Sequence, residues 1–447
     1  MVRQRFQNTL KTAIARLSIT MPAAAVSEPR TDPALEPIRE RVLAGERLSI
    51  EQGRTLYNTP DLIGVCELAH EVRTRLHGRT AYYNINRHLN YSNVCALSCK
   101  FCEFYRKQGQ AGEYTRAIDE IAAEGRKAVE LGATEMHIVG GLNPYLPFEY
   151  YTDMLRALKE VAPRVHLKAF TAVEIVHLAR IAKVYKRDDR RGSMRWVLEQ
   201  LIEAGLESLP GGGAEVFDDR VHKEAFKAKI GADEWLDVHM VAHELGLNTN
   251  ATMLYGHVDS RDERLSHMHI LRRMQDQALA RLGYDGTDTP PDDISDAPEI
   301  TLTGEGAVLP TPTLGQGYYQ TIIPLPFFPD GSALEHLPGP TGLENLRTLA
   351  VARLMLDNFP HAKSFWIMQT LEMAQFMLGS GADDIDGTVV WYDITKVGGS
   401  STHQETTVWD LRKAIGEAGF EAVERDTLYR RVVRDGKDWH LAADGQA

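Results

Sequence analysis

The stretch Cys95-Ala96-Leu97-Ser98-Cys99-Lys100-Phe101-Cys102 decides how the rest of this chain is interpreted. Its cysteines are spaced C-x-x-x-C-x-x-C, so one short loop can wrap a cubic [4Fe–4S] cluster. Such clusters are usually held by four cysteine thiolates. A loop that supplies only three leaves one iron open to a small molecule. The stretch therefore predicts a [4Fe–4S] cluster with Cys95, Cys99 and Cys102 as its ligands.

A structural zinc site is the alternative for this loop. Zinc takes four Cys or His ligands, and Cys66, His88 or His137 could supply the fourth. Zinc ribbons usually carry two paired knuckles, however, whereas this chain has one group of cysteines. Cys66 stands alone in an apolar segment and is expected to be a small core residue. The spacing therefore favours the iron–sulfur cluster.

Composition excludes several classes of protein. The chain has 447 residues, of which 43% are hydrophobic and 25% charged, as in ordinary globular proteins. The net charge of −12 argues against nucleic acid as a partner, because phosphate binding needs concentrated positive charge. No stretch approaches the ~20 apolar residues of a membrane helix. Four cysteines do not make a disulfide framework, and an exposed cluster requires a reducing compartment, so we expect a cytoplasmic protein.

Residues 1–30 are left out of the fold prediction. Their first acid is Glu28, and all their basic residues but one come before it, which faintly resembles an organellar transit segment. The simpler interpretation is a disordered extension, or a translation start placed too early, with Met21 as the true first residue.

The apolar pattern predicts a (β/α)8 TIM-type barrel over residues 81–402. Residues 31–80 have apolar spacings of three and four, which indicate an N-terminal helical segment. From residue 81 onward, short apolar runs alternate with helical stretches, a pattern typical of a parallel sheet. Residues 403–447 are expected to form a small α/β appendage. The expected strands are Tyr82 to Asn90, Glu135 to Val139, Val165 to Phe170, Leu206 to Leu209, Asn248 to Leu254, Tyr319 to Leu325, Ser364 to Met368 and Asp384 to Val390.

Two segments interrupt this alternation. Residues 185–195 are rich in Lys and Arg and are expected to form a solvated surface loop. Residues 283–317 are rich in Pro, Gly, Thr and Asp and contain no Lys or Arg. This composition predicts a flexible acidic insertion, for which a passive role is favoured over that of a lid.

Candidate binding residues stand at the ends of the expected strands, where barrels of this type carry their function. Gly140-Gly141 end the second strand, and their bare backbone can approach a ligand closely. Gly211-Gly212-Gly213 end the fourth; their amides could form a nest for a carboxylate, or simply a sharp turn. Alternation along the fifth strand sends Asn250 and Thr252 one way and Thr249 and Ala251 the other, so only half of these residues can face the site.

The candidate substrate residues come from the first and fifth strands. Arg87 and His88 are candidate anchors for an anionic substrate, because an arginine fork donates two parallel hydrogen bonds to a carboxylate. Thr252, Tyr255 and His257 end the fifth strand, and buried polar groups of this kind need a partner. His257 could also donate or accept a proton.

The cysteine loop, with Phe101 before its last cysteine, resembles that of the radical S-adenosylmethionine (SAM) enzymes. The resemblance implies that the open iron chelates the amino and carboxylate groups of SAM, and that electron transfer cleaves SAM into methionine and a 5′-deoxyadenosyl radical. In these enzymes an acid after the Gly-Gly pair holds the SAM amino group. Leu142 stands at that place here, so backbone carbonyls would have to serve. The implied SAM-contacting residues are Phe101, Gly140, Gly141, Gly212, Gly213 and Glu215.

Further segments narrow the resemblance to one branch. Asn86 to Cys95 is similar to the cluster-leading strand of the menaquinone and F420 branch. Five segments resemble the aminofutalosine synthases within that branch: His137 to Pro144, Lys168 to Ala172, Pro210 to Glu215, Asp384 to Thr388 and Glu424 to Tyr429. The match covers roughly residues 35–430, apart from the acidic insertion.

The resemblance implies a reaction that consumes SAM as a co-substrate. The 5′-deoxyadenosyl radical would add to the enol-ether double bond of 3-[(1-carboxyvinyl)oxy]benzoate. The product radical would attack the aromatic ring, migrate and lose bicarbonate, giving 6-amino-6-deoxyfutalosine for menaquinone biosynthesis. An electron donor such as flavodoxin or ferredoxin is implied as partner. The sister enzymes, dehypoxanthine futalosine cyclase and the F420-type tyrosine transferase, remain alternatives, as does a noncatalytic zinc or iron–sulfur protein.

Overall fold

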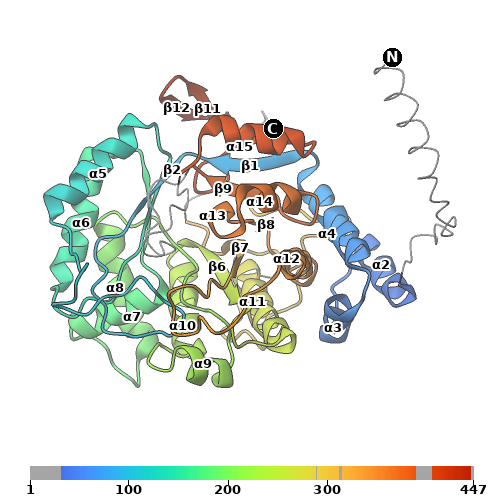
Figure 1. Cartoon of the computed structure of the whole chain (residues 1–447), viewed down its shortest axis with the longest axis horizontal. Helices are drawn as coiled ribbons and strands as arrows, with labels where there is room; N and C mark the ends of the chain where they lie inside the picture. Colours follow the sequence, from blue (N-terminus) through green and yellow to red (C-terminus); the bar gives the residue numbers. More distant parts are fainter. Residues whose placement is uncertain (1–31, 288, 312–314, 389–404, 444–447) are drawn as a thin grey trace, which may run out of the picture.

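The computed structural model describes residues 32–287, 289–311, 315–388 and 405–443; the expectation for residues 1–30 lies outside them. Its centre is a parallel sheet of seven strands that follow one another in chain order (Figure 1). The strands are β2 (Asn86–Leu89), β3 (Glu135–Ile138), β4 (His166–Ala169), β5 (Ser208–Leu209), β6 (Asn248–Tyr255), β7 (Tyr319–Pro326) and β8 (His361–Ala362). The predicted α/β barrel class is confirmed.

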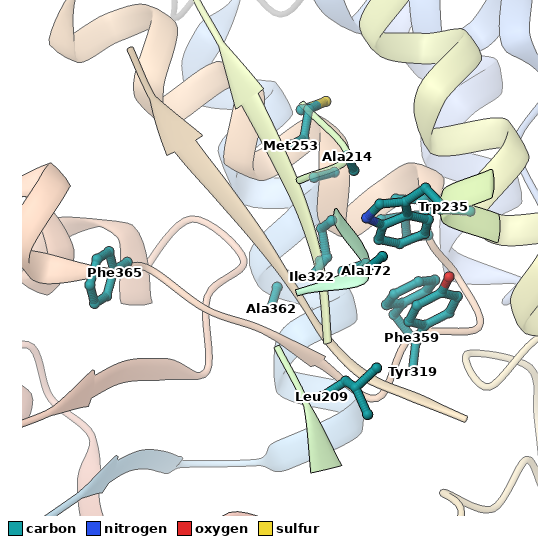
Figure 2. Packing of buried hydrophobic residues seen from close by; sticks show 14 of the residues in the cluster. Ala172, Leu209, Ala214, Trp235, Met253, Tyr319, Ile322, Phe359, Ala362 and Phe365 are labelled. Carbon is teal, nitrogen blue, oxygen red and sulfur yellow. The ribbon is translucent and has the colours of Figure 1, made fainter. Parts of the chain in front are cut away.

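Helices follow the strands and cover the outer face of this sheet (Figure 1). They are α5 (Ile118–Glu130), α6 (Phe148–Val161), α7 (Ala172–Ile181), α8 (Arg190–Glu203), α9 (Asp219–Ala225), α10 (Ala232–Glu244), α11 (Arg261–Arg281), α12 (Gly342–Met355), α13 (Trp366–Gln369) and α14 (Leu371–Leu378). Apolar residues fill the space between the layers; Figure 2 shows Trp235, Tyr319 and Phe359 lying together. The rings of Tyr319 and Phe359 stack with centroids 5.4 Å apart. None of the described helices is long and apolar enough to cross a membrane.

The first predicted strand and the last two differ from those observed. The first splits at Ile85, because β1 (Thr80–Asn84) pairs with β9 (Asp384–Gly387) and β10 (Glu421–Glu424) in a second sheet of order β10-β1-β9. The predicted strand over 364–368 is wrong: the strand is β8, and α13 begins at Trp366. One parallel bridge, between Lys363 and Asp384, links the seven-stranded sheet to β9. The predicted eighth strand thus exists but belongs mainly to the second sheet.

The C-terminal segment completes this second sheet. It contains α15 (Val408–Glu417), β10, and the antiparallel hairpin β11 (Val432–Asp435) with β12 (Asp438–Leu441). Arg425, just after β10, donates from Nε to the carboxylate of Asp384 over 2.7 Å, and both side chains are buried. Breaking a buried ion pair leaves an uncompensated charge, which is costly. This pair therefore stabilises the contact between the C-terminal segment and β9.

The predicted N-terminal helical segment is present as η1 (Pro33–Leu35), α2 (Glu36–Leu43), α3 (Ile50–Asn58) and α4 (Leu62–His77). Ser49 begins α3 with a capping box, exchanging hydrogen bonds with Gln52. Asp61 caps α4 by accepting from the Gly64 amide over 2.8 Å. α4 then packs along α12, so this segment covers the outside of the barrel.

Residues 283–317 are packed onto the barrel where the structure describes them. Ile300 and Leu302 are buried against the end of α11. The Ile300 amide donates to Asp276 over 3.1 Å, and the Ile300 carbonyl accepts from Arg47 over 2.8 Å. No described residue of this segment lines the main pocket. The described part of the expected insertion is therefore held on the barrel by apolar anchors.

The basic stretch 185–195 is only partly a loop, since α8 begins at Arg190. Asp189 caps this helix by accepting from the Gly192 amide over 3.0 Å. Arg190 pairs with Asp237 of α10 over 2.8 Å, while Arg191 and Arg195 both pair with Glu244. The charges thus align α8 with α10, although half-exposed pairs each contribute little to stability.

Candidate active site

One pocket of about 310 Å³ opens at the carboxyl ends of the strands and extends into the barrel. The cysteine loop lines one part of it through Cys95, Cys99 and Cys102. Apolar side chains line the middle: Leu97, Phe101, Val139, Leu142, Val173, Leu254, Ile323, Leu325, Phe327, Phe328, Phe365 and Met368. Buried charged groups line the floor: Glu135, Lys168, Lys363 and Asp386. A pocket of this kind, apolar with a few convergent polar groups, is typical of a small-molecule site.

The side chain of Lys107 binds the backbone of the cysteine loop. The Lys107 ammonium donates to the carbonyl oxygens of Cys95, Ala96 and Leu97 over 2.9, 3.1 and 2.8 Å. The Ala96 amide donates to the carbonyl of Leu142 over 2.9 Å, which joins the loop to the strand end after β3. Three carbonyls on one cation restrict the first part of the loop, which carries Cys95.

The thiols fit an iron–sulfur cube better than a zinc ion. All four cysteines are free, and the three in the loop are half-buried. Zinc binds sulfur at ~2.3 Å, which requires its ligand atoms to converge closely. Among the described residues, the only group of three or more ligand atoms within 4.8 Å of one another is His77, His361 and Asp383, outside the loop. The loop cysteines are not in this group, and their soft thiolate donors suit a cube.

A buried cation lies beside the loop. The Lys229 ammonium pairs with Glu215 and lies 5.2 Å from the ring centroid of Phe101. Burial opposes its charge, but Glu215 and Cys99 raise the pKa of Lys229 on balance. Glu215 has a φ of 49°, in the left-handed region. A buried non-glycine residue persists there only when its surroundings impose it, so Lys229 and Glu215 form a fixed ion pair at the pocket wall.

The glycine pair packs against the segment that joins β2 to the cysteines. A Cβ on Gly140 would lie 2.6 Å from Cζ of Tyr91, and one on Gly141 would lie 2.3 Å from the carbonyl oxygen of Val94. Neither space can hold a methyl group. The pair is therefore required by close backbone approach, in addition to any ligand contact.

Glu174 of α7 is a site residue that the sequence prediction missed. One carboxylate oxygen accepts from the Gly140 amide over 3.0 Å and from the Tyr91 hydroxyl over 2.7 Å. The other accepts from the amide and the hydroxyl of Thr171 over 2.7 and 2.8 Å. A carboxylate thus reaches the glycine turn from α7, the helix that follows β4, although Leu142 offers none directly after the glycine pair. Thr171-x-x-Glu174 is a capping box, so the helix start was visible in the sequence but the link to Gly140 was not.

Replacing Gly140 with alanine is expected to misplace the cysteine loop. The new methyl group would displace the Tyr91 ring, which would also break the Tyr91–Glu174 hydrogen bond. Overpacking of this kind typically costs ~1–3 kcal/mol. We expect a lower unfolding midpoint in denaturant and a lower iron content after reconstitution. Gly416→Ala is the matched control, because no atom lies within 4 Å of its Cβ position; equal iron content in both variants would contradict this role.

Of the predicted fifth-strand residues, Thr252 lines the pocket. Its hydroxyl donates to the Gly211 carbonyl over 2.7 Å. Asn250 and Leu254 line the pocket with it, as alternation predicts. Thr249 faces the helix layer, where its hydroxyl lies 2.8 Å from Nε2 of His243.

Tyr255 and His257 do not line the pocket. The Tyr255 hydroxyl donates to Asn345 of α12 over 2.9 Å, because its position in β6 faces the helices. His257 follows the strand, and its Nε2 lies 3.0 Å from the Leu254 carbonyl. Their expected role as substrate residues is contradicted by these positions.

Arg87 also lies outside the pocket, on the helix side of β2. Its Nε donates to Glu124 of α5 over 2.8 Å, and a second guanidinium nitrogen donates to the same oxygen. Strand alternation turns its neighbour His88 inward. His88 packs on His137, with ring centroids 4.5 Å apart, and His137 lines the pocket. The predicted Arg87 anchor is therefore wrong, and the cations of the pocket are lysines.

Comparison with known proteins identifies the relatives of this chain. Residues 89–271 match the Radical SAM superfamily, and residues 316–435 match the CofH/MqnC C-terminal region. An aminodeoxyfutalosine synthase of Thermus thermophilus is 42% identical, over 90% of this chain and 96% of that protein. One of Streptomyces coelicolor is 40% identical, over 89% and 94%. A 5-amino-6-(D-ribitylamino)uracil–L-tyrosine 4-hydroxyphenyl transferase of Methanopyrus kandleri is 31% identical, over 82% and 89%.

A solved structure agrees with the fold. The crystal structure of methylornithine synthase superposes with a TM-score of 0.62, covering 86% of this chain and 97% of that one. Its sequence is only 14% identical, so this likeness concerns the barrel and not the substrate.

Proposed function

Because this chain belongs to the aminodeoxyfutalosine synthase family of radical SAM enzymes, we propose that its pocket joins a 5′-deoxyadenosyl group from SAM to 3-[(1-carboxyvinyl)oxy]benzoate. The products are 6-amino-6-deoxyfutalosine, methionine and bicarbonate, in menaquinone biosynthesis. The observation that carries this proposal is the 42% identity, which extends over 96% of the Thermus protein. The match therefore extends over most of both chains.

The pocket divides into parts that fit the two substrates. Bound together, the [4Fe–4S] cluster and SAM supply the 5′-deoxyadenosyl radical. Cys95, Cys99 and Cys102 are the proposed cluster ligands, and Lys107 holds the backbone at the first of them. The SAM contacts proposed on resemblance are Phe101, Gly140, Gly141, Gly212, Gly213 and Glu215, all but Phe101 at the ends of β3 and β5.

The remaining lining residues suit an aromatic acid. The apolar belt formed by Ile323, Leu325, Phe365 and Met368 can pack on a benzoate ring and exclude water from a radical. Bond formation requires the vinyl carbon within ~3–3.5 Å of the adenosyl carbon. Thr252 lines the same pocket, and the hydrogen bond from its hydroxyl to the Gly211 carbonyl fixes its side chain. We assign it a positioning role.

We also propose that a small electron carrier such as flavodoxin or ferredoxin docks beside the cysteine loop. Ala96, Ser98 and Lys100 of the loop are exposed, so a donor can approach the cluster closely. Lys100 adds positive charge that suits an acidic carrier. The free thiols of a cluster-binding loop also require a reducing compartment, which supports a cytoplasmic location.

The test is an anaerobic assay of cluster-reconstituted protein with SAM, a strong reductant and 3-[(1-carboxyvinyl)oxy]benzoate, analysed by mass spectrometry. We expect an adduct with the mass of 6-amino-6-deoxyfutalosine. Formation of 5′-deoxyadenosine without an adduct would indicate a sister enzyme, such as dehypoxanthine futalosine cyclase or the tyrosine transferase. An intact cluster without SAM cleavage would indicate a noncatalytic iron–sulfur protein and overturn the proposal.

A further inference from the structure

The floor of the pocket contains two buried lysines from different strands. Lys168 of β4 is 3% exposed, and its ammonium donates to Glu135 of β3 over 2.8 Å. Lys363, directly after β8, is also 3% exposed and donates to Asp386 of β9 over 3.3 Å. Both lysines line the same cavity as the cysteine loop.

These lysines are poorly explained by stability alone. Removing two opposite charges from water costs several kcal/mol, and a buried pair often contributes no more than apolar residues of the same volume. The floor has two such pairs, with Arg425 and Asp384 adjoining them. A group of charges kept at the end of a pocket is more often a functional arrangement.

Each ammonium retains hydrogen-bonding capacity. A lysine has three N–H donors. Among the described residues, each of these two ammoniums donates to one side chain, Lys168 to Glu135 and Lys363 to Asp386. The Lys363 bond, at 3.3 Å, is the longer one, so this lysine can turn toward a ligand with little loss. The acceptor that suits the remaining donors is a carboxylate.

The depth of the lysines relates them to one end of the substrate. Glu135 is the first residue of β3, so Lys168 reaches toward the amino ends of the strands. Lys363 follows β8, but β8 pairs with the first half of β7, so Lys363 also lies below the carboxyl ends of the longer strands. The cysteine loop follows β2 at the carboxyl ends. The reacting vinyl group must be near the adenosyl carbon, on the cysteine side. The ring carboxylate is the group that extends away from it.

We propose that Lys168 and Lys363 form a carboxylate subsite at the closed end of the pocket, which holds the ring carboxylate of the aryl substrate. The inference rests on the proposed function and adds the anchor that Arg87 cannot supply. The ring then lies in the apolar belt beside Phe365 and Met368. The two cations are on separate strands, so they fix the direction of the substrate along the barrel as well as its affinity.

The test measures binding without turnover. Cluster-loaded protein with SAM, but without reductant, is titrated by equilibrium dialysis with 3-[(1-carboxyvinyl)oxy]benzoate and with its ring carboxamide analogue. We expect the native protein to prefer the acid by about 10-fold or more, as for a charge-assisted contact. Lys363→Gln, and Lys168→Gln combined with Glu135→Gln, are each expected to lose this preference. The combined variant avoids leaving Glu135 unpaired.

Controls separate this role from a structural one. Lys159→Gln removes a lysine that pairs with Glu207 over 2.6 Å on the outer side of the barrel, and it should keep the preference. SAM affinity and the unfolding midpoint are measured for every variant, and Lys363→Gln serves if the combined variant does not fold. The subsite is overturned if a variant loses affinity equally for the acid and the carboxamide, or if its preference for the acid is unchanged. Native protein that binds neither compound overturns the proposed function with it.

Discussion

Replacing Cys102 with serine is expected to abolish cluster assembly and SAM cleavage together. The loop offers three thiolates, and the group of converging metal-ligand atoms found among the described residues, His77, His361 and Asp383, lies outside the loop. Serine oxygen is a hard donor, whereas iron–sulfur clusters need soft thiolates. After anaerobic reconstitution, iron should fall from about four atoms per chain to near zero. The brown absorption and 5′-deoxyadenosine formation should disappear with it.

Cys66→Ser is the matched control for this experiment. Cys66 is 8% exposed on α4 and does not line the pocket. Its substitution should leave iron content and SAM cleavage unchanged, at a modest cost in stability. If Cys102→Ser still formed 5′-deoxyadenosine at the native rate, the cysteine loop would not be the cluster site.

Acidification is expected to unfold the protein well above the pH at which carboxylates titrate. Burial lowers the pKa of several histidines that face the core. The pKa falls to about 3 for His77 and His239, and to about 4 for His88, His166 and His267. In the unfolded chain these groups titrate near 6.5.

The sign follows from the protons that each state binds. Below pH 6.5 these histidines bind protons in the unfolded chain but not in the folded chain. The free energy of unfolding therefore decreases as the pH is lowered. Each such histidine contributes a slope of up to ~1.4 kcal/mol per pH unit between 6.5 and its folded pKa. Near pH 5, the summed loss of free energy from several such histidines would reach a typical protein stability of ~5–15 kcal/mol. Stability should be fully regained above about pH 7.

Urea unfolding between pH 8 and pH 5, followed by circular dichroism, measures this slope. His166→Gln should lower this slope by up to ~1.4 kcal/mol per pH unit, because it removes one titrating group. Gln can keep a hydrogen bond to Ser208, whose hydroxyl lies 2.8 Å from Nε2 of His166, so the fold should be preserved. Substituting the exposed His440 should leave the slope unchanged. A free energy of unfolding that is constant from pH 7 to pH 5 would contradict this account of the buried histidines.

Local patterns predicted much of this molecule. Strand–helix alternation identified the parallel barrel. Period-two alternation along β6 correctly separated Asn250 and Thr252 from Thr249. These predictions succeeded because each depends on neighbours within one element.

Predictions that depended on distant partners failed more often. Arg87 looked like a substrate anchor, but Glu124 of α5 takes its guanidinium. The strand at Asp384 was recognised, but not that β1 and β10 would take it into a second sheet. The polar composition of residues 283–317 gave no sign of the contacts that Ile300 and Leu302 make with the end of α11.

The sequence by itself determined the chemistry of the cysteine loop, because its three ligands lie within eight residues and their spacing limits what they can bind. It also determined the barrel class, through the period of its apolar residues. Only the tertiary structure decided the rest of the site. Glu174 reaches Gly140 from another helix, and Lys168 and Lys363 meet on the floor from strands almost 200 residues apart. Such contacts depend on how the strands assemble, which no local pattern encodes.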